Sequence, residues 1–426
     1  MERFKVNRVE FMIMSRTLTL SAILLSILVS IVLLGGLVWT NTLFVQNHPL
    51  EKDFLVPWLG ARTLLQYGDN PYGDAATQRA QIVYYGRLAV EGEDPLLLSV
   101  AFPLELFYFP FALIPNYPLA RGFWMTLIEI ALMALGLTSL RLTGWRPVSS
   151  LLPVLLLFSV FWVYGFTAIL KGGAVVFIAL AVVGSLLAIQ THQDELAGAL
   201  LVIPLFKMGI TAGFMVFILW WMFYHRRWRI LAGILMALIV LLGLTFLFLP
   251  NWFFPFVRGV IAHFIYQPGL TPGQMLGTWW PSVGPRLGWM LTGIGLVALL
   301  LEWRATRGDD PRQFILTTCL TLAITPLLGI PYSAQDVLLL FIPLIMFLTI
   351  LGERWHRLKG WGISGITLII LFFLSWLQPA IKYLGGNTKS WEGLVPMIFP
   401  ILLTIGLYWM RWWAIHTPLT WSDSLS

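Results

Sequence analysis

Charged residues are scarce in this chain and cysteine is almost absent. Only 11% of its 426 residues are Asp, Glu, Lys or Arg, while 58% are hydrophobic and the mean hydropathy is +0.82. Soluble domains carry about 25% charged residues, so this composition excludes a soluble globule. It predicts an all-α, polytopic membrane protein, which we treat as one integral membrane domain. The single cysteine, Cys319, lies in an apolar segment, which excludes an intrachain disulfide and predicts a buried packing residue.

Motifs for metal and nucleotide chemistry are also missing. No His or Cys cluster has the spacing of metal ligands, and there is no GxxxxGK[ST] phosphate loop. We therefore expect neither a metal nor a cofactor, and a lipid-linked rather than a nucleotide-linked donor. The net charge of +7 comes from short basic clusters at the ends of apolar runs. That pattern is typical of membrane orientation, so we expect the lipid bilayer, and no nucleic acid, as partner.

Apolar runs recur along the whole chain. A bilayer core of about 30 Å takes about 20 apolar residues in a helix. The first run is longer than a signal-peptide core and no cleavage pattern follows it, so we expect an uncleaved transmembrane helix. The second of two adjoining runs, 196–206 and 208–224, either crosses by itself or continues the first as one bent span. About twelve spans are predicted, at 17–40, 119–141, 147–168, 172–190, 196–206, 208–224, 230–250, 286–303, 314–330, 336–351, 361–378 and 396–410.

Basic clusters predict which side of the membrane each segment occupies. Lys and Arg accumulate on the cytoplasmic side of membrane proteins. Here they include the N-terminal residues Arg3, Lys5, Arg8 and Arg16, then Arg141, Arg146, 225–229, 303–312, 353–359 and Arg411. We therefore expect a multi-pass protein of the cell membrane with both termini in the cytoplasm. The external segments are then 41–118, 251–285 and 379–395; between and after them lie helices 2–7 (119–250) and the C-terminal helices (286–426).

An alternative topology lets residues 98–115 cross the membrane, which moves Arg141 and Arg146 outside and merges 196–224 into one span. We favour the first topology because residues 102–118 hold four prolines and an acid, which suits a helix lying on the surface better than one in lipid.

Asp53 follows the first apolar run and opens the long external segment. Pro57 and Gly68 predict the start and end of a short amphipathic helix, GDNPYG a turn, and residues 76–92 a second helix. A carboxylate held at one membrane surface suits an enzyme that deprotonates a water-side acceptor while binding a lipid-borne donor. Asp53 is the best candidate for the base. The alternatives are a solvated loop acid or a cap for the following helix, and Glu51 is a weaker candidate for the base.

Three segments of the chain stand out together: DFLVPWLGARTLLQYGDNPYG, AFPLELFYFPFALIPNYPLARGFW and ELAGALLVIPLFKMGITAGF. They resemble, in this order, the opening motif, the aromatic and proline-rich surface segment, and a segment leading to a lysine in glycosyltransferase family 87. This family comprises the polyprenyl-phosphate-mannose-dependent mannosyltransferases of the GT-C superfamily. The likeness covers roughly residues 50–230. ILKGGAVVFIAL differs, because Lys171 is present and the family's usual Gly-Gln pair is absent.

The resemblance implies a GT-C-like fold and a metal-independent hexosyltransferase. Such an enzyme transfers a hexose, mannose in this family, from a polyprenyl-phosphate sugar to a glycolipid or glycan on the external face, with inversion. Asp53 is then the catalytic base. The donor phosphate is assigned to Lys207, Lys171 and Arg121. The substrate contacts are assigned to Glu51, Arg62, Asn70, Tyr72, Tyr332, Gln335 and Asp336.

Other interpretations stay open. Lys207 in apolar surroundings can snorkel to the surface, Arg121 can anchor the interface, and Asp336 can serve the helix dipole. Glu129 is predicted to pack through a hydrogen bond, and His263 to lie at the membrane interface. A lipid or sugar transporter would also have about twelve spans, but we find no repeated half. A polysaccharide polymerase or ligase is expected to carry its large external segment late in the chain.

Overall fold

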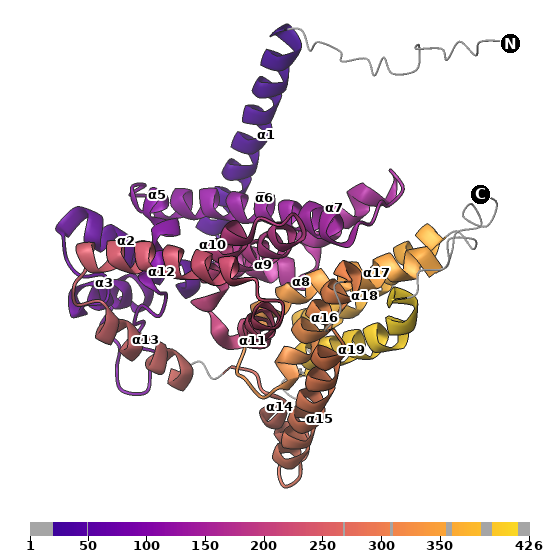
Figure 1. Ribbon diagram of the computed structural model, residues 1–426. Helices are drawn as coiled ribbons and strands as arrows, with labels where there is room; N and C mark the ends of the chain where they lie inside the picture. The colour runs from indigo at the N-terminus through magenta and orange to yellow at the C-terminus, as the bar shows by residue number, and fades with distance from the viewer. Residues whose placement is uncertain are drawn as a thin grey trace, which may run out of the picture.

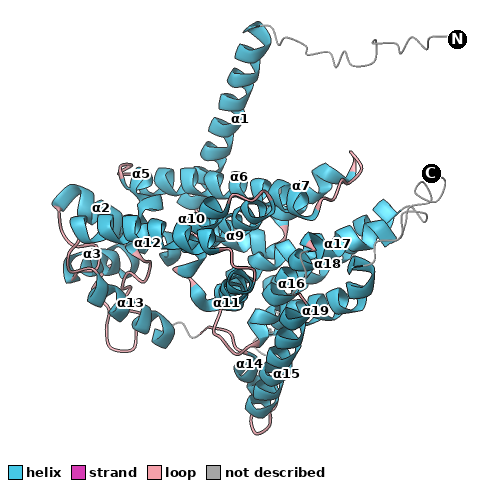
Figure 2. Cartoon of the chain, viewed as in Figure 1, coloured by secondary structure: helices cyan, strands magenta, loops and turns pink. Residues whose placement is uncertain are grey.

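The computed structural model describes residues 20–48, 50–266, 269–306, 310–354, 360–384 and 394–415. Within these ranges the regular structure is entirely helical, as Figure 2 shows. The described residues include one isolated β-bridge, between Leu270 and Tyr332, and no strand. The all-α class predicted from the sequence is confirmed. The N-terminal basic residues and part of the segment 379–395 lie outside the described ranges.

The helices follow one another with short connections. The first part of the chain forms α1 (Leu20–Gln46), α2 (Lys52–Tyr67), α3 (Asp74–Tyr85), α4 (Phe102–Glu105), η1 (Leu106–Tyr108), α5 (Phe109–Ala112), α6 (Tyr117–Thr143), α7 (Leu151–Phe161), α8 (Val163–Lys171), α9 (Val175–Gln190), α10 (Asp194–Leu205), α11 (Met208–Tyr224) and α12 (Trp228–Phe248). The second part forms α13 (Phe253–Tyr266), α14 (Pro272–Trp279), α15 (Gly284–Ala305), α16 (Pro311–Ile324), η2 (Thr325–Leu327), η3 (Ala334–Leu340), α17 (Phe341–Arg354), α18 (Gly360–Tyr383) and α19 (Leu394–Ile415).

Seven helical segments among the described residues are long and apolar enough to cross a membrane, or eight if α7 and α8, which meet at a bend of 47°, form one span. The chain is therefore a membrane protein. Each of the twelve predicted runs falls on a helix. However, α9, α10, α11 and α16 have only 16, 12, 17 and 14 residues, fewer than a straight crossing needs. The number twelve stays a prediction.

α1 stands away from the rest of the protein and meets it at its C-terminal end (Figure 1). There it crosses α6 at Gly122, where a Cβ atom would lie 2.3 Å from the hydroxyl of Thr42. Asn41 donates from Nδ2 to Thr126 Oγ1 at 3.0 Å and to Glu129 Oε1 at 3.2 Å. The hydrogen-bonded packing role predicted for Glu129 is therefore present, as a polar contact that joins the two helices.

α10 and α12 approach closely because each carries a glycine at their crossing. A Cβ on Gly198 would lie 2.1 Å from the carbonyl oxygen of Ile230, and one on Gly233 would lie 2.3 Å from that of Glu195. Any side chain at either position would push the helices apart. This pair forms a rigid part of the fold behind the α10–α11 junction.

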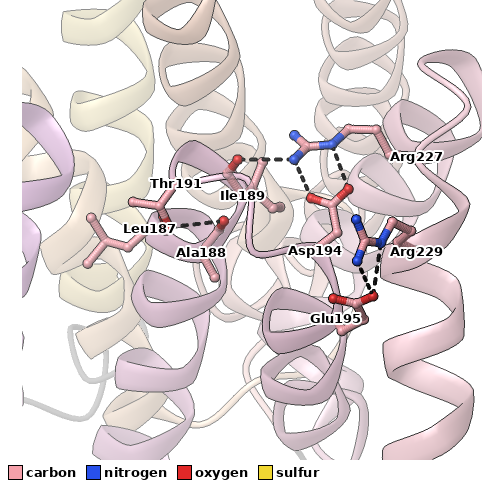
Figure 3. A network of polar contacts seen from close by, with 8 residues as sticks. All are labelled: Leu187, Ala188, Ile189, Thr191, Asp194, Glu195, Arg227 and Arg229. Carbon is pink, nitrogen blue, oxygen red and sulfur yellow. Dashed lines mark hydrogen bonds and ion pairs between the residues drawn. The ribbon is translucent and has the colours of Figure 1, made fainter.

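A network of ion pairs holds the same helices where α9 turns into α10 (Figure 3). Arg227 donates from Nε to Asp194 Oδ2 at 3.1 Å and from Nη2 to the carbonyl oxygen of Ile189 at 3.2 Å. Arg229 donates from Nε to Glu195 Oε1 at 2.9 Å. The acids stand in the first turn of α10, where the helix dipole favours negative charge.

The segment after α1 folds into two compact helices. α2 begins at Lys52, five residues before the start that Pro57 predicted, so Asp53 belongs to its first turn. Proline is tolerated there because only the carbonyl of Asp53 loses its helical N–H partner. Gly68 ends α2 in the left-handed conformation, with φ of 70°, as predicted. The second helix, α3, spans 74–85. It begins two residues before the predicted helix 76–92 and ends seven residues before the predicted end.

The helices bear on two questions of topology: whether residues 98–115 cross the membrane, and whether residues 196–224 form one helix or two. Residues 98–115 form α4, η1 and α5, of four, three and four residues, and no helix there is long enough to cross a bilayer. Residues 194–224 form two helices that break at Phe206 and Lys207 rather than one. Further along, α16 packs against α17 and α19, and Cys319 in α16 is fully buried as predicted.

Candidate functional site

Asp53 lies half-buried in the first turn of α2 and is bound from the far end of the chain. Gln335 donates from Nε2 to Asp53 Oδ2 at 3.2 Å, across 282 residues of sequence. No side-chain hydrogen bond caps α2 at Glu51, the residue before its first turn. The alternative of a plain solvated loop acid does not describe Asp53, because its carboxylate is held by a buried amide.

Gln335 stands on η3 and is 7% exposed. Its amide packs over the backbone of Gly173, where a Cβ atom would lie 2.9 Å from Oε1 and 3.1 Å from Nε2. The glycine therefore leaves room for the amide to reach Asp53. Gln335 Oε1 is buried and accepts no hydrogen bond within the described part of the chain.

Asp336, next to Gln335, pairs with Lys207. The distance from Lys207 Nζ to Asp336 Oδ1 is 2.5 Å, and Asp336 Oδ2 accepts the backbone N–H of Ser333 at 2.9 Å. Asp336 is 3% exposed, whereas the Lys207 side chain is 33% exposed. Lys207 therefore pairs with an acid and does not only extend to the membrane surface. Asp336 both caps η3 and forms the ion pair with this lysine.

Arg121 is buried in α6 and caps the C-terminal end of α8. Its Nη2 donates to the carbonyl oxygens of Ile169, at 3.1 Å, and Leu170, and its guanidinium lies 5.1 Å from the centroid of the Phe54 ring. Nη1 is buried without a hydrogen-bond partner among the described residues. At 2% exposure, Arg121 is not an interfacial anchor.

The side chains of Trp124 and Arg121 both lie against the backbone at Gly172. Trp124 donates from Nε1 to the Gly172 carbonyl oxygen at 2.8 Å, and a Cβ atom at Gly172 would lie 1.5 Å from Arg121 Nη1. Gly172 also has φ of 77°, which disfavours any other residue. The Gly172–Gly173 pair therefore lets Arg121 and Gln335 approach the same short stretch of chain.

Lys171 and Glu51 are the remaining charged groups of this cluster. Lys171 is half-buried and has neither an ion pair nor a hydrogen bond in the described ranges. Burial raises the pKa of Glu51, the charge of Asp53 raises it further, and the charges of Arg121 and Lys171 lower it. Glu51, Asp53, Arg121, Lys171, Lys207, Gln335 and Asp336 together are called the Asp53 site below.

The exposed His263 of α13 is influenced by the same charges. Desolvation lowers the pKa of His263, while the charge of Asp53 raises it and that of Lys207 lowers it. Gly259 of α13 packs against the backbone at Leu98, where a Cβ atom would lie 2.2 Å from the carbonyl oxygen. Sequence reasoning predicted only an interfacial helix here. Its amphipathic pattern did not show what it covers.

Four residues predicted to contact substrate are engaged elsewhere. Arg62 lies 5.5 Å from the Trp58 ring centroid and donates to the Ala112 carbonyl at 3.4 Å. Asn70 accepts the N–H of Tyr72 at 2.9 Å, which closes the predicted turn.

The two tyrosines among these four are buried in the protein. The Tyr72 hydroxyl donates to the Val100 carbonyl at 2.7 Å. Tyr332 is 3% exposed, and its hydroxyl donates to the carbonyl oxygen of Pro396 at 3.4 Å. The hydrogen bonds of Asn70, Tyr72 and Tyr332 stabilise turns and packing rather than the Asp53 site.

Sequence reasoning missed Glu105 as a residue of interest. It was noted only as an acid that disfavours a spanning helix, yet its side chain is fully buried and both oxygens lack a hydrogen-bond partner in the described part of the chain. Burial raises its pKa well above the usual value. Its Oε1 lies where a Cβ on Gly60 of α2 would be 2.7 Å away. An acid within an aromatic, proline-rich segment was the available signal.

The site holds acids, cations and an amide but no metal-binding cluster. Within the described ranges, no group of three or more His, Cys, Asp or Glu side chains could hold a metal ion. Comparison with protein-family models, with curated proteins and with solved structures finds no significant match to this chain. The chemistry has therefore to be argued from the Asp53 site itself.

Proposed function

We propose that the protein is a membrane glycosyltransferase that transfers a hexose from a polyprenyl-phosphate sugar to an acceptor hydroxyl, with inversion, and that Asp53 is the general base. The observation that supports this most is the Asp53 carboxylate, which accepts a hydrogen bond from Gln335. The Lys207–Asp336 ion pair is next to Gln335, and the charges of Arg121 and Lys171 act on the nearby Glu51. An acid held in place beside cations suits proton removal next to a departing phosphate.

The proposed reaction balances with these groups. The acceptor oxygen attacks the anomeric carbon of the sugar while its proton passes to the Asp53 carboxylate. The bond from the anomeric carbon to the phosphate oxygen breaks, and its electron pair leaves with the phosphate. Attack opposite to the leaving group inverts the anomeric centre. No redox partner is needed.

Lys171 is the first choice for the departing phosphate. Its ammonium group has three donors and no ion pair within the described ranges. Lys207 keeps donors beyond its contact with Asp336, whereas Arg121 is largely used by carbonyl groups of α8. A cation beside the phosphate stabilises the charge that develops as the bond breaks.

The finer parts of the proposal come from the sequence. The resemblance to family 87 favours mannose, a GT-C-like fold and a glycolipid or glycan acceptor. The basic clusters favour the cell membrane, with the Asp53 site on the external face and both termini in the cytoplasm.

A transporter for lipid or sugar is the second candidate. Helix breaks at Trp162 and at Phe206–Lys207 resemble the discontinuous helices that transporters use to bind substrate. A transporter would bind the lipid-linked sugar and release it chemically unchanged.

The deciding experiment supplies purified protein with polyprenyl-phosphate sugars and membrane lipid acceptors and measures glycosylated product. Asp53→Asn should lower kcat by about 10²- to 10⁴-fold, because the amide cannot take the proton. Asp74→Asn, at an exposed acid in the first turn of α3, is the matched control and should leave kcat unchanged. Full activity of Asp53→Asn would refute the base, and vesicle uptake without product would favour transport.

A further inference from the structure

The ion pair between Lys207 and Asp336 lies one residue away from the amide that holds Asp53. Lys207 stands at the break between α10 and α11, with φ of −134° and ψ of 71°. The break itself is fixed, since Thr211 Oγ1 donates to the carbonyl oxygens of Pro204, at 2.9 Å, and Lys207, at 2.7 Å. Lys207 therefore extends from a well-held piece of backbone.

The start of α11 also fits closely against the chain that leads into η3. A Cβ atom on Gly209 would lie 2.9 Å from the carbonyl oxygen of Pro331. On the other side, the backbone of Tyr332 exchanges two hydrogen bonds with Leu270, at 2.7 and 3.3 Å. The chain segment that leads into η3 is thus held by α11 and by Leu270, in addition to the Lys207 contact.

Asp336 connects this junction to η3. Its two carboxylate oxygens are engaged at once, one by the Lys207 ammonium at 2.5 Å and the other by the Ser333 N–H at 2.9 Å. A carboxylate with both oxygens engaged fixes the first turn of η3 about its own side chain. Gln335 belongs to that turn, and its amide donates to Asp53 Oδ2 at 3.2 Å.

We infer that Lys207 is a positioning residue, which acts through Asp336 and η3 to hold the Gln335 amide on the carboxylate of Asp53. This rests on the proposed function, in which Asp53 is the base. Lys207 does not contact the donor phosphate, which is left to Lys171. Removing Lys207 leaves a buried carboxylate without its cation, so η3 shifts and the base loses its orientation.

The arrangement predicts which kinetic constant depends on Lys207. A misoriented base slows proton transfer but leaves donor binding intact, so kcat falls and KM changes little. A lost phosphate contact would raise the KM of the donor as well. The same logic makes the effects of Lys207 and Gln335 overlap, because both act on one orientation of Asp53.

The test compares Lys207→Met, Gln335→Ala, the two combined, and the charge exchange Lys207→Asp with Asp336→Lys. Lys207→Met should lower kcat about 10- to 100-fold and change the donor KM less than about threefold. Adding Lys207→Met to Gln335→Ala should lower kcat by less than about threefold more. The charge exchange should recover part of the lost kcat, because it restores the ion pair but not the hydrogen bond in which Asp336 accepts the Ser333 N–H.

Opposite results would overturn the inference. A raised donor KM, or independent multiplication of the Lys207 and Gln335 effects, would mean that Lys207 binds the phosphate. The charge exchange then fails too, because a carboxylate at position 207 repels phosphate. If the exchanged protein does not fold, the double-mutant comparison with Gln335→Ala still decides.

A second measurement needs no substrate and separates this inference from the proposed function. Amide hydrogen exchange in residues 333–340 of the full-length protein should be faster in Lys207→Met than in the wild type. Absence of glycosyl transfer in the wild type would reject the proposed function and leave this result standing. Unchanged exchange in Lys207→Met would reject the positioning role alone.

Discussion

Two polar clusters hold helices together in this protein, and they differ in how completely their groups are paired. In the network at the α9–α10 turn, Arg227 is matched to Asp194 and Arg229 to Glu195. In the Asp53 site, Lys171 has no ion pair and Arg121 Nη1 and Gln335 Oε1 have no hydrogen-bond partner in the described part of the chain. A fully paired network fixes structure, whereas unfilled donors beside a held carboxylate leave capacity for a ligand.

The largest effect expected on donor binding tests the unpaired groups of the Asp53 site. Lys171→Met should raise the KM for the polyprenyl-phosphate donor about 10- to 100-fold and also lower kcat, because it removes the cation that is assigned to the bound and to the departing phosphate. Steady-state kinetics with varied donor measures it. Arg87→Met, which removes an exposed arginine paired with Glu93, is the control and should leave the donor KM unchanged. An unaltered KM in Lys171→Met would place the phosphate elsewhere.

Breaking an ion pair of the network at the α9–α10 turn should instead lower the stability of the protein. Asp194→Asn should lower the free energy of unfolding by about 1.5 kcal/mol, because Arg227 loses a charged partner in a mostly buried pair, with side chains 12% and 18% exposed. Chemical unfolding in a mild detergent measures the change, and donor KM should not change. The matched Glu195→Gln affects a pair exposed by 50% and 73%, so its cost should stay below about 0.5 kcal/mol. Equal losses of unfolding free energy in Asp194→Asn and Glu195→Gln would contradict the expected difference between the buried and the exposed pair.

Glu105 differs from both clusters, because its carboxyl group has no hydrogen-bond partner in the described part of the chain. Its pKa is raised by burial, so the folded protein holds a proton that the unfolded chain releases above about pH 4.5. Stability conferred by that proton is present below this pH and declines by up to about 1.4 kcal/mol per pH unit above it, until the raised pKa is passed. In Glu105→Gln this decline should disappear. The difference in the free energy of unfolding between the wild type and Glu105→Gln should therefore grow from pH 5 to pH 8. Parallel pH profiles of the two proteins would contradict the assignment.

Local chemistry explains what could be read from the sequence. Spans follow from apolar length, and Gly68 ends α2 because only a residue that tolerates positive φ fits there. Asp53, Lys207 and Asp336 were singled out because acids and lysines beside apolar runs need partners. Their pairing depends on tertiary packing, which brings η3 to α2 across 282 residues. Pattern reasoning has no access to that contact.

The same limit explains the errors. Pro57 suggested a helix start, but α2 begins at Lys52, and its first turn is held by the Lys52–Asp94 ion pair and by the hydrogen bond from Gln335 to Asp53. Tyr72 and Arg62 belong to the segment that resembles the family's opening motif, yet the turn at Asn70 and the packing on Trp58 direct them elsewhere. Glu105 carried no motif, and its complete burial arises only when α4 packs under α2.

The burial of the only thiol has a practical consequence. Cys319 is enclosed in α16 at 0% exposure, so water-soluble maleimides have no native target to modify. Cysteines introduced singly near Asp74, in the α9–α10 turn or in the α12–α13 connection can then be labelled from one face of sealed vesicles at a time. Each label reports the side of the membrane on which its own segment lies, without removal of the native cysteine.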